Sequence, residues 1–440
     1  MSEGQFDFCG EFKDALELME NSKHHIFITG KAGSGKSTLL RYFKDITRKN
    51  NITLAPTGIA AVNVDGQTVH SFFSLPLGFI APDQVKKLYH DKKKIIRNLD
   101  VLLIDEASML RADMFDAIDY SLRINSGKKN IPFGGIRIIM FGDIFQLPPI
   151  VKGSMRHIME NYYDAPYFFN AKVMSAINLK CIQLNRIYRQ KDNQFIELLG
   201  RIRINECTDE DIDVLNERVG IVGVDDEYTT LTTTNNDAEN INKSFLKKIK
   251  SKEYQYAASV TKNFTSSSCP TEMILCLKKG ARVILLNNDK EKRWVNGTIA
   301  QIRGITNDSV KISVNGQTYI LEKFVWEKIR YTFDESDQEI KEEVIGSFKQ
   351  YPIKLAWAIT IHKSQGQTFE KVVIDIGRGA FSPGQLYVAL SRCRSLNGVI
   401  LKRPLKMSDV IIDDNLHSFQ SMIVKTENNC LGSGKRDGAR

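Results

Sequence analysis

Short apolar runs alternate with helical patterns through the first half of the chain. Each run is followed by a turn or by a helical stretch, which predicts buried strands joined by helices. The four runs are HHIFIT at 24–29, NITLAP at 51–56, VLLIDE at 101–106 and IRIIMFGD at 136–143. Nearly continuous apolar strands with helical crossovers are typical of a parallel sheet covered on both faces. The pattern therefore predicts an α/β domain.

A second series of apolar runs predicts a second α/β domain. It begins with CIQLN at 181–185 and YTTLTTT at 228–234, and resumes with KVVIDI at 371–376 and GVIL at 398–401. Between about 259 and 350, polar and apolar residues instead alternate between Asn-Gly turns, which indicates a small antiparallel β-barrel. A further insertion is expected at about 67–97, where phenylalanines give way to a run of lysines at 92–94.

These patterns divide the chain into domains. We expect a first domain over residues 1–180 and a second domain in two parts, 181–258 and 351–428. The inserted barrel, over 259–350, separates those two parts. Residues 429–440, which contain GSGKRDGAR, are predicted to form a disordered tail.

Composition narrows the class of protein. The 440 residues are 42% hydrophobic and 26% charged, as in a soluble globular protein, and no apolar run is long enough to span a bilayer. The first twenty residues are acidic and amphipathic, unlike a targeting leader. Seven scattered cysteines without a C-x-x-C pair argue for reduced thiols and against a zinc module. A net charge of +9 favours a polyanionic partner, although a merely solvated basic surface would give the same value.

A phosphate-binding loop is the clearest chemical motif. GKAGSGKS at 30–37 fits G-x-x-x-x-G-K-S/T, with a predicted strand before it and the helix-forming STLLRYFKDI after it. The helix N-terminus and the loop N–H groups would face the phosphates, with Lys36 reaching the β- and γ-phosphates and Ser37 binding Mg²⁺. GSGK at 432–435 lacks this context and is rejected. The expected nucleotide contacts in the loop are Gly30, Ala32, Gly33, Ser34, Gly35, Lys36, Ser37 and Thr38.

Acidic and amide side chains follow two further predicted strands. Asp105 and Glu106 end the strand at 101–105, where one carboxylate can hold Mg²⁺ and the other can take a proton from the attacking water. We assign Asp105 to the metal and Glu106 to the general base. Gln146 follows the strand at 136–141 and is expected to sense the γ-phosphate, whereas Asp143 reads more simply as a turn cap.

The order of these motifs resembles superfamily-one helicases of the 5′-to-3′ branch. The Pif (petite integration frequency) family is the nearest match and RecD-type helicases come next. The resemblance spans about residues 15–394. It is carried by GKAGSGKST, APTGIAAVNVDGQTVHSFF, IDEASM, PFGGIRIIMFGDIFQLPP, LNRIYRQ, LTTTNNDAENIN, WAITIHKSQGQT and LYVALSRCRS.

The resemblance implies two RecA-like domains with ATP and Mg²⁺ between them. Arg189 in IYRQ and Arg392 in ALSR match the arginines that complete such sites, with Arg186 a lesser candidate, and Gly366 matches a nucleotide contact. A guanidinium there would stabilise charge on the transferring phosphoryl group. Taken alone, either arginine would more often be a surface residue.

The resemblance also implies a track for single-stranded DNA. Backbone and hydroxyl groups suit phosphates, Lys suits charge, and Phe72 is assigned to base stacking. The competing interpretation places Phe72 and Phe73 in the core. The segment after Phe72 resembles a strand-separating wedge. The residues carried over are Pro56, Thr57, Gly58, His70, Ser71, Phe72, Thr360, His362 and Lys363.

One position departs from the family pattern. Related helicases carry a glutamine before the phosphate loop that reads adenine, and the alignment places Phe12 there, with Gln5 at the wrong spacing. The departure puts selectivity for ATP over other nucleoside triphosphates in question.

The expected function is an ATP-dependent DNA helicase. The resemblance implies 5′-to-3′ movement on single-stranded DNA, with forked or tailed duplexes and G-quadruplexes as substrates, in replication, repair, recombination and telomere-type processes. We expect a monomer in free solution without a membrane partner. Its expected location is a bacterial or phage-like cytoplasm in association with the nucleoid, or a nucleus or mitochondrion if the protein is eukaryotic. The alternatives are an RNA-directed helicase of the same branch and a non-hydrolysing module that binds single strands. Stimulation of ATP hydrolysis by DNA or by RNA separates them.

Overall fold

The computed structural model describes most of the chain. Its described residues are 10–76, 78–151, 153–190, 192–220, 228–261, 269–421 and 423. The tail predicted at 429–440 and Gln5 lie outside these ranges. Within them, no helix is both long enough and apolar enough to cross a bilayer.

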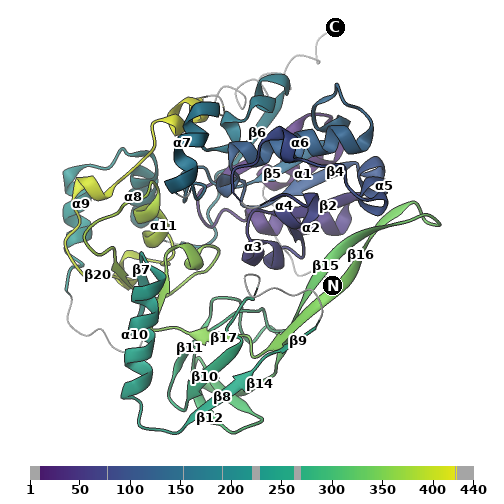
Figure 1. Cartoon of the computed structure of the whole chain (residues 1–440). Helices are drawn as coiled ribbons and strands as arrows, with labels where there is room; N and C mark the ends of the chain where they lie inside the picture. The colour runs from purple at the N-terminus through teal and green to yellow at the C-terminus, as the bar shows by residue number, and fades with distance from the viewer. Residues whose placement is uncertain are drawn as a thin grey trace.

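The first domain is built on a parallel sheet of six strands in the order β3-β2-β4-β5-β1-β6 (Figure 1). All four strands predicted in the first half of the chain are present. The strands are β1 (His25–Gly30), β2 (Asn51–Ala55), β3 (Gln67–Thr68), β4 (Val101–Ile104), β5 (Arg137–Phe141) and β6 (Leu179–Leu184).

Two boundaries of the first domain differ from the prediction, and the inserted antiparallel body also includes strands at Glu253–Ala257 and Ile353–Leu355, outside the predicted 259–350. CIQLN at 181–185 was placed in the second domain, but β6 pairs in parallel with β1 along its whole length and so forms an edge of the first sheet. An apolar edge strand has the same local pattern as the first strand of a new domain, so composition could not separate the two. The start of the expected insertion at 67–97 is likewise the short strand β3, which pairs with β2.

Helices cover both faces of this sheet, because alternate side chains of each strand point to opposite faces. Phe27 of β1 packs into one hydrophobic cluster, and its neighbours Ile26 and Ile28 pack into the other. The helices are α1 (Gly10–Asn21), α2 (Lys36–Ile46), α3 (Gly58–Asn63), α4 (Val69–Phe73), α5 (His90–Asn98), α6 (Ala112–Ser126) and α7 (Gly153–Tyr162). Short 3₁₀ turns lie at Pro82–Gln84, Ala107–Met109, Pro132–Gly135, Phe168–Asn170 and Lys172–Ala176.

The second domain has a smaller parallel sheet in the order β18-β7-β19-β20. Its core is a separate hydrophobic cluster. The strands are β7 (Thr229–Thr232), β18 (Ala358–Thr360), β19 (Val372–Asp375) and β20 (Val399–Leu401). The helices are α8 (Asn193–Ile204), α9 (Asp209–Asn216), α10 (Asn235–Lys248) and α11 (Gln385–Leu390), with 3₁₀ turns at His362–Ser364, Leu396–Gly398 and Met407–Asp409.

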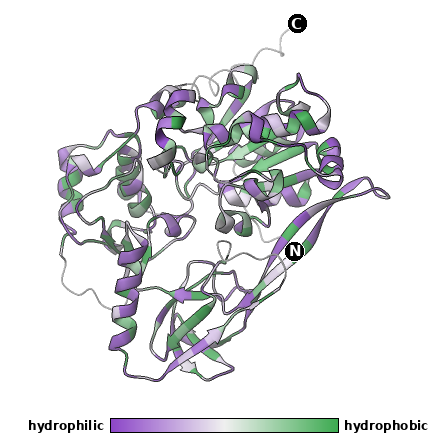
Figure 2. Cartoon of the chain, viewed as in Figure 1, coloured by the Kyte–Doolittle hydropathy of each residue, from purple (hydrophilic) through white to green (hydrophobic). Residues whose placement is uncertain are grey.

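Between β7 and β18 lies a body of antiparallel strands, drawn at the bottom of Figure 1. They fall into three sheets, β14-β13-β12-β11-β17, β10-β8 and β15-β16-β9, and the first two share one core. The strands are β8 (Glu253–Ala257), β9 (Ser259–Val260), β10 (Ile274–Lys278), β11 (Arg282–Leu285), β12 (Ile299–Ile305), β13 (Val310–Val314), β14 (Gln317–Leu321), β15 (Phe324–Asp334), β16 (Glu339–Gln350) and β17 (Ile353–Leu355). In Figure 2, hydrophobic residues gather along the strands, whereas α10 is hydrophilic over most of its length.

The β15–β16 hairpin extends from this body onto the first domain (Figure 1). The Tyr331 hydroxyl accepts a hydrogen bond from Thr53 N at 3.1 Å and lies 3.3 Å from Thr53 O. The Gln67 side chain bonds the Ile329 carbonyl, and Asn50 Nδ2 donates to Gln338 O at 3.1 Å. Sequence periodicity predicts this segment as part of the small antiparallel barrel and gives no sign that it docks on the first domain.

Candidate functional site

The phosphate loop joins β1 to α2. Gly33 and Gly35 have φ of +85° and +86°, backbone angles that glycine adopts without strain. Gly35 caps α2, so the helix N-terminus opens directly onto the loop. Lys36 Nζ donates to Gly30 O at 2.7 Å and Lys31 O at 3.1 Å, and burial lowers the pKa of this lysine. The loop thus presents N–H groups and an ammonium group to one point, as phosphate binding requires.

Two carboxylates follow β4: Asp105 is 6% exposed, and Glu106 is half-buried. Burial and the neighbouring Glu106 raise the pKa of Asp105 to about 7, and burial also raises the pKa of Glu106. Glu106 has a φ of +50°, a left-handed conformation that is uncommon outside glycine. Adjacent carboxylates in a poorly solvated site favour a bound cation, since each disfavours the other's charge.

The residues around Asp105 fit magnesium held together with phosphate. The Asp105 carboxylate and the Ser37 hydroxyl are oxygen donors that line the same cleft. In the described ranges no three His, Cys, Asp or Glu side chains gather to hold a metal by themselves. Mg²⁺ commonly uses one or two protein oxygens and completes its shell with phosphate and water. Asp105 and Ser37 are therefore the candidates to hold it.

Gln146 lies after β5, where the sequence placed a γ-phosphate sensor. It is 7% exposed, lines the cleft, and its Nε2 lies 3.5 Å from Asp143 Oδ2. Asp143 does cap the turn, accepting from Phe145 N at 3.3 Å. It also forms a buried ion pair with Arg203 of α8 at 2.8 Å, a contact that sequence reasoning missed.

Arg189 and Arg392 both line the cleft, facing the phosphate loop from the chain after β6 and from the end of α11. Burial, and the proximity of Arg392, lower the pKa of Arg189 to about 9. Arg392 is buried and Arg189 half-buried, and two poorly solvated guanidinium groups near each other favour an anionic ligand. Arg186, the lesser candidate, instead stacks over the Tyr188 ring at 5.2 Å.

The cleft between the two sheets has a volume of about 1270 Å³. It brings together nearly all of the predicted nucleotide contacts, and Gly30 takes part through its bond to Lys36. The predicted residues that line it are Ala32, Gly33, Ser34, Gly35, Lys36, Ser37, Thr38, Asp105, Glu106, Gln146, Arg189, Gly366 and Arg392.

The predicted strand contacts follow carboxyl ends of strands in both domains. Pro56, Thr57 and Gly58 come directly after β2, and Thr57 caps α3 by accepting from Ala60 N at 3.3 Å. Thr360 ends β18, where its hydroxyl accepts from Lys363 N at 3.3 Å.

The predicted DNA-contact residues differ in how far their side chains are exposed to solvent. Thr57, His362 and Lys363 also line the cleft. On α4, Ser71 is exposed and His70 is half-buried, whereas Thr360 is buried. Ser71 and Lys363 are therefore open to a ligand in this conformation.

Phe72 does not suit the base-stacking role predicted for it. Its ring is 1% exposed, 4.8 Å from the Phe73 ring and 6.3 Å from Tyr331 of the hairpin. Lys92 Nζ closes the end of the same helix by donating to Phe72 O at 2.6 Å. Stacking on a base requires an open ring face. The competing interpretation, a core residue, is the one that the structure shows.

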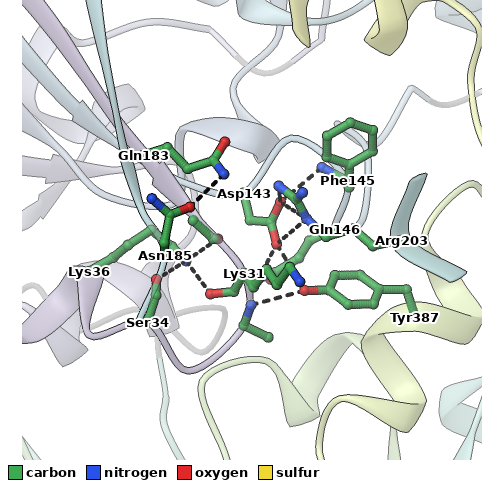
Figure 3. A network of polar contacts seen from close by, with 12 residues as sticks. Lys31, Ser34, Lys36, Asp143, Phe145, Gln146, Gln183, Asn185, Arg203 and Tyr387 are labelled. Atoms are coloured by element: carbon green, nitrogen blue, oxygen red, sulfur yellow. Dashed lines mark hydrogen bonds and ion pairs between the residues drawn. The ribbon is translucent and has the colours of Figure 1, made fainter. Parts of the chain in front are cut away.

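Phe12 packs beneath the phosphate loop. Its ring is 4% exposed, and a Cβ added to Gly35 would lie 2.8 Å from it. The adjacent Glu11 carboxylate accepts from Asn185 N at 2.9 Å, and Asn185 Oδ1 accepts from Gln183 at 2.8 Å (Figure 3). A phenyl ring offers no hydrogen bond to a base, so this position supports the loop and cannot read adenine.

Comparison with known proteins agrees with this geometry. A family model described as PIF1-like helicase matches residues 11–213, and a UvrD-like helicase C-terminal domain matches 355–400. The chain is 31% identical over 407 residues to the ATP-dependent DNA helicase Pif1 of Bdellovibrio bacteriovorus, covering 90% of this chain and 88% of the relative. It is 34% identical to human ATP-dependent DNA helicase PIF1, covering 85% of this chain but 57% of that longer protein.

Solved structures show the same relationship. Bacteroides sp Pif1 in complex with ADP-AlF4 superposes with a TM-score of 0.89 at 38% identity, covering 96% of this chain and 98% of that one. Bacteroides Pif1 bound to ssDNA superposes with a TM-score of 0.69 at the same identity, covering 96% and 97%. The resemblance inferred from the motifs is confirmed: this chain belongs to the PIF1-like helicase family.

Proposed function

We propose that this protein is an ATP-dependent DNA helicase that moves along single-stranded DNA. The observation that carries the proposal is the cleft between the two domains. One wall supplies a phosphate loop and two carboxylates, and the other supplies Arg392. A site divided in this way is complete only when the domains are closed, so a nucleotide that contacts both walls favours the closed arrangement.

The residues divide the chemistry of hydrolysis among them. Lys36 and the loop N–H groups hold the phosphates, and Gln146 orients the attacking water. Glu106 accepts the proton of that water, a role that its raised pKa favours. Arg189 and Arg392 stabilise charge on the transferring phosphoryl group. Mg²⁺, held by Asp105 and Ser37, would neutralise charge on the phosphate oxygens.

Strand movement follows from the placement of the strand contacts. Thr57 lies in the first domain, whereas His362 and Lys363 lie in the second, and all three line the cleft. Opening and closing of the cleft therefore changes the spacing between two sets of strand contacts. Alternating grip by the two sets converts hydrolysis into steps along one strand.

Relatives support single-stranded and forked DNA as the substrates. Among the solved relatives are Bacteroides Pif1 bound to ssDNA and a structure titled for DNA unwinding at forked dsDNA by two coordinating Pif1 helicases. We extend the proposal to 5′-to-3′ movement, to G-quadruplexes as obstacles, and to work in replication, repair, recombination and telomere-type processes. The relatives come from bacteria and eukaryotes. We propose that this chain works in a bacterial or phage-like cytoplasm, associated with the nucleoid, and that it is a monomer before it binds DNA.

The deciding experiment measures steady-state ATP hydrolysis alone, with single-stranded DNA, and with single-stranded RNA of equal length. Strong stimulation by DNA and little by RNA supports the proposal. A larger effect of RNA points to an RNA-directed helicase. Hydrolysis that neither polymer changes would contradict the coupling between the two sites. GTP in place of ATP, in a parallel set, tests whether Phe12 costs the enzyme its selectivity for adenine.

A further inference from the structure

A tyrosine from the second domain bonds both the phosphate loop and the chain after β5. Tyr387 lies on α11, and its hydroxyl accepts a hydrogen bond from the backbone N–H of Ala32 at 2.9 Å. The same hydroxyl donates to Asp143 Oδ2 at 3.2 Å (Figure 3). One oxygen atom of the second domain thus connects two phosphate-handling segments of the first.

Arg203 of α8 completes this connection. Its Nη2 and Nε donate to Asp143 Oδ1 at 2.8 and 3.1 Å, and its guanidinium lies 4.3 Å from the centre of the Phe145 ring. Two helices of the second domain therefore meet on one carboxylate of the first (Figure 3). We call Tyr387, Asp143 and Arg203 the carboxylate joint.

Burial of the three joint residues fixes which group donates each hydrogen bond, and it makes loss of any one partner destabilising. Asp143 is 0%, Tyr387 3% and Arg203 7% exposed. Burial alone would raise the pKa of Asp143, but Arg203 and Lys36 outweigh it and hold the pKa below its usual value. Burial raises the pKa of Tyr387, so the hydroxyl keeps its proton and donates to the carboxylate. Loss of one partner would leave buried polar groups unpaired.

The backbone of α11 packs tightly against the chain after β5, next to the joint. Gly384 caps α11 with a φ of +69°, and a Cβ there would lie 2.4 Å from Phe145 O and 2.6 Å from Gln146 O. The N-terminus of α11 therefore rests on the backbone of Gln146. At its other end, the same helix leads to Arg392, whose Nε donates to Val388 O at 2.9 Å.

We propose that the carboxylate joint positions the phosphate loop and Gln146 against α11, and so sets the placement of Arg392 whenever the cleft closes. In the part of the chain that the structure describes, none of the three joint residues lines the cleft. They are positioning residues, acting on the reacting groups through Ala32, Gln146 and α11. The inference rests on the proposed function, because it concerns how DNA-stimulated hydrolysis is assembled.

The test is Tyr387→Phe in the full chain, with Tyr163→Phe as the matched control. Tyr163 also donates to a carboxylate, Asp116 Oδ2 at 2.9 Å, but within the first domain. Each variant loses one tyrosine–aspartate hydrogen bond, and Tyr387→Phe also loses the bond from the Ala32 backbone N–H. We expect Tyr387→Phe to lower kcat for DNA-stimulated hydrolysis about tenfold, the effect of one such bond worth about 1.4 kcal/mol in the transition state. The KM for ATP should change far less, and Tyr163→Phe should keep the wild-type kcat.

The outcomes separate the two proposals. If wild-type protein shows no stimulation by DNA, the proposed function fails. If wild-type protein is stimulated and Tyr387→Phe matches Tyr163→Phe in kcat, the joint does not position the site and the inference is overturned. Thermal unfolding of each variant establishes that it is folded. Arg203→Lys, which keeps the charge but loses the forked pairing, replaces Tyr387→Phe if that variant does not fold, with the same lowered kcat expected.

Discussion

The Arg189 guanidinium donates a hydrogen bond to the backbone carbonyl of Ser391, the residue before Arg392, at 3.2 Å. The two arginines that face the phosphate loop are thus joined through one residue. Since Arg392 Nη2 also donates to the Ser391 hydroxyl at 2.8 Å, a shift of this turn moves both guanidinium groups together. The site therefore depends on the loop after β6 and on α11 at once.

Lys36→Ala should remove hydrolysis while leaving strand binding largely intact. Lys36 is the cation of the loop, and loss of one preorganised charge commonly costs about 10²- to 10³-fold in kcat. ATP hydrolysis and fluorescence anisotropy of labelled single-stranded DNA measure the two properties. Near-normal turnover in this variant would show that the loop is not the phosphate site.

Glu106→Gln should bind ATP and fail to hydrolyse it. The amide keeps the shape of the side chain but cannot accept the proton of the attacking water. Rapid filtration with labelled ATP should therefore recover uncleaved nucleotide on the protein. Recovery of ADP at the wild-type rate would remove Glu106 from the role of base.

Acidity should stabilise the nucleotide-free and metal-free protein through Asp105. Its pKa in the folded state, about 7, lies above the usual value of 3.8, so the folded state holds the proton more tightly than the unfolded state. This contribution to the free energy of unfolding is present below about pH 4 and is lost as the pH rises towards 7. Thermal unfolding should show a smaller pH dependence over this range in Asp105→Asn. The same dependence in both proteins would contradict the assignment.

Phe72→Ala should destabilise the protein by about 3–5 kcal/mol, as expected for a large ring removed from a core. Phe73→Ala is the matched control, because that ring is also 1% exposed. Denaturant unfolding should give similar losses, and the folded fraction of each should bind single-stranded DNA alike. A selective loss of affinity in Phe72→Ala would restore the base-stacking role.

Lys363→Ala should weaken strand binding and lower its salt dependence. Lys363 is exposed at the carboxyl end of the second sheet, and removal of one phosphate contact reduces the slope of log K against log salt by about 1. Lys128 is also exposed, and it lies in the connection between α6 and β5, before a strand of the first sheet and not after the carboxyl end of one. Lys128→Ala should leave both affinity and slope unchanged. Equal slopes for wild type and Lys363→Ala would exclude this contact.

The sequence predicts best what is decided locally. The phosphate loop, the acids after β4 and Gln146 each follow an apolar strand, and the ends of neighbouring parallel strands necessarily meet at one edge of the sheet. The role of Phe72 could not be predicted in this way, because the local sequence of a short helix is the same whether its aromatic ring packs in the core or stacks on a base. One of the rings packed against it, Tyr331, comes from a hairpin distant in the sequence.

The carboxylate joint had no local signal at all. Asp143 and Arg203 are 60 residues apart, and Asp143 and Tyr387 are 244 apart. Arg203 lies in the last turn of α8, where a basic residue is favourable in any helix. Only the packing of two domains shows that this arginine faces inward.

Docking of the β15–β16 hairpin also protects a weak point of the first sheet. Strand β3 is two residues long and pairs only with Leu54 and Ala55, so β2 continues past its neighbour at Thr53. Unpaired backbone at a sheet edge is a template on which a second chain can add a strand. The Tyr331 hydroxyl, 278 residues away in the sequence, hydrogen-bonds both the N–H and the C=O of Thr53. The docked hairpin thus gives these two backbone groups a partner within the chain, and they are not left as a template for another strand.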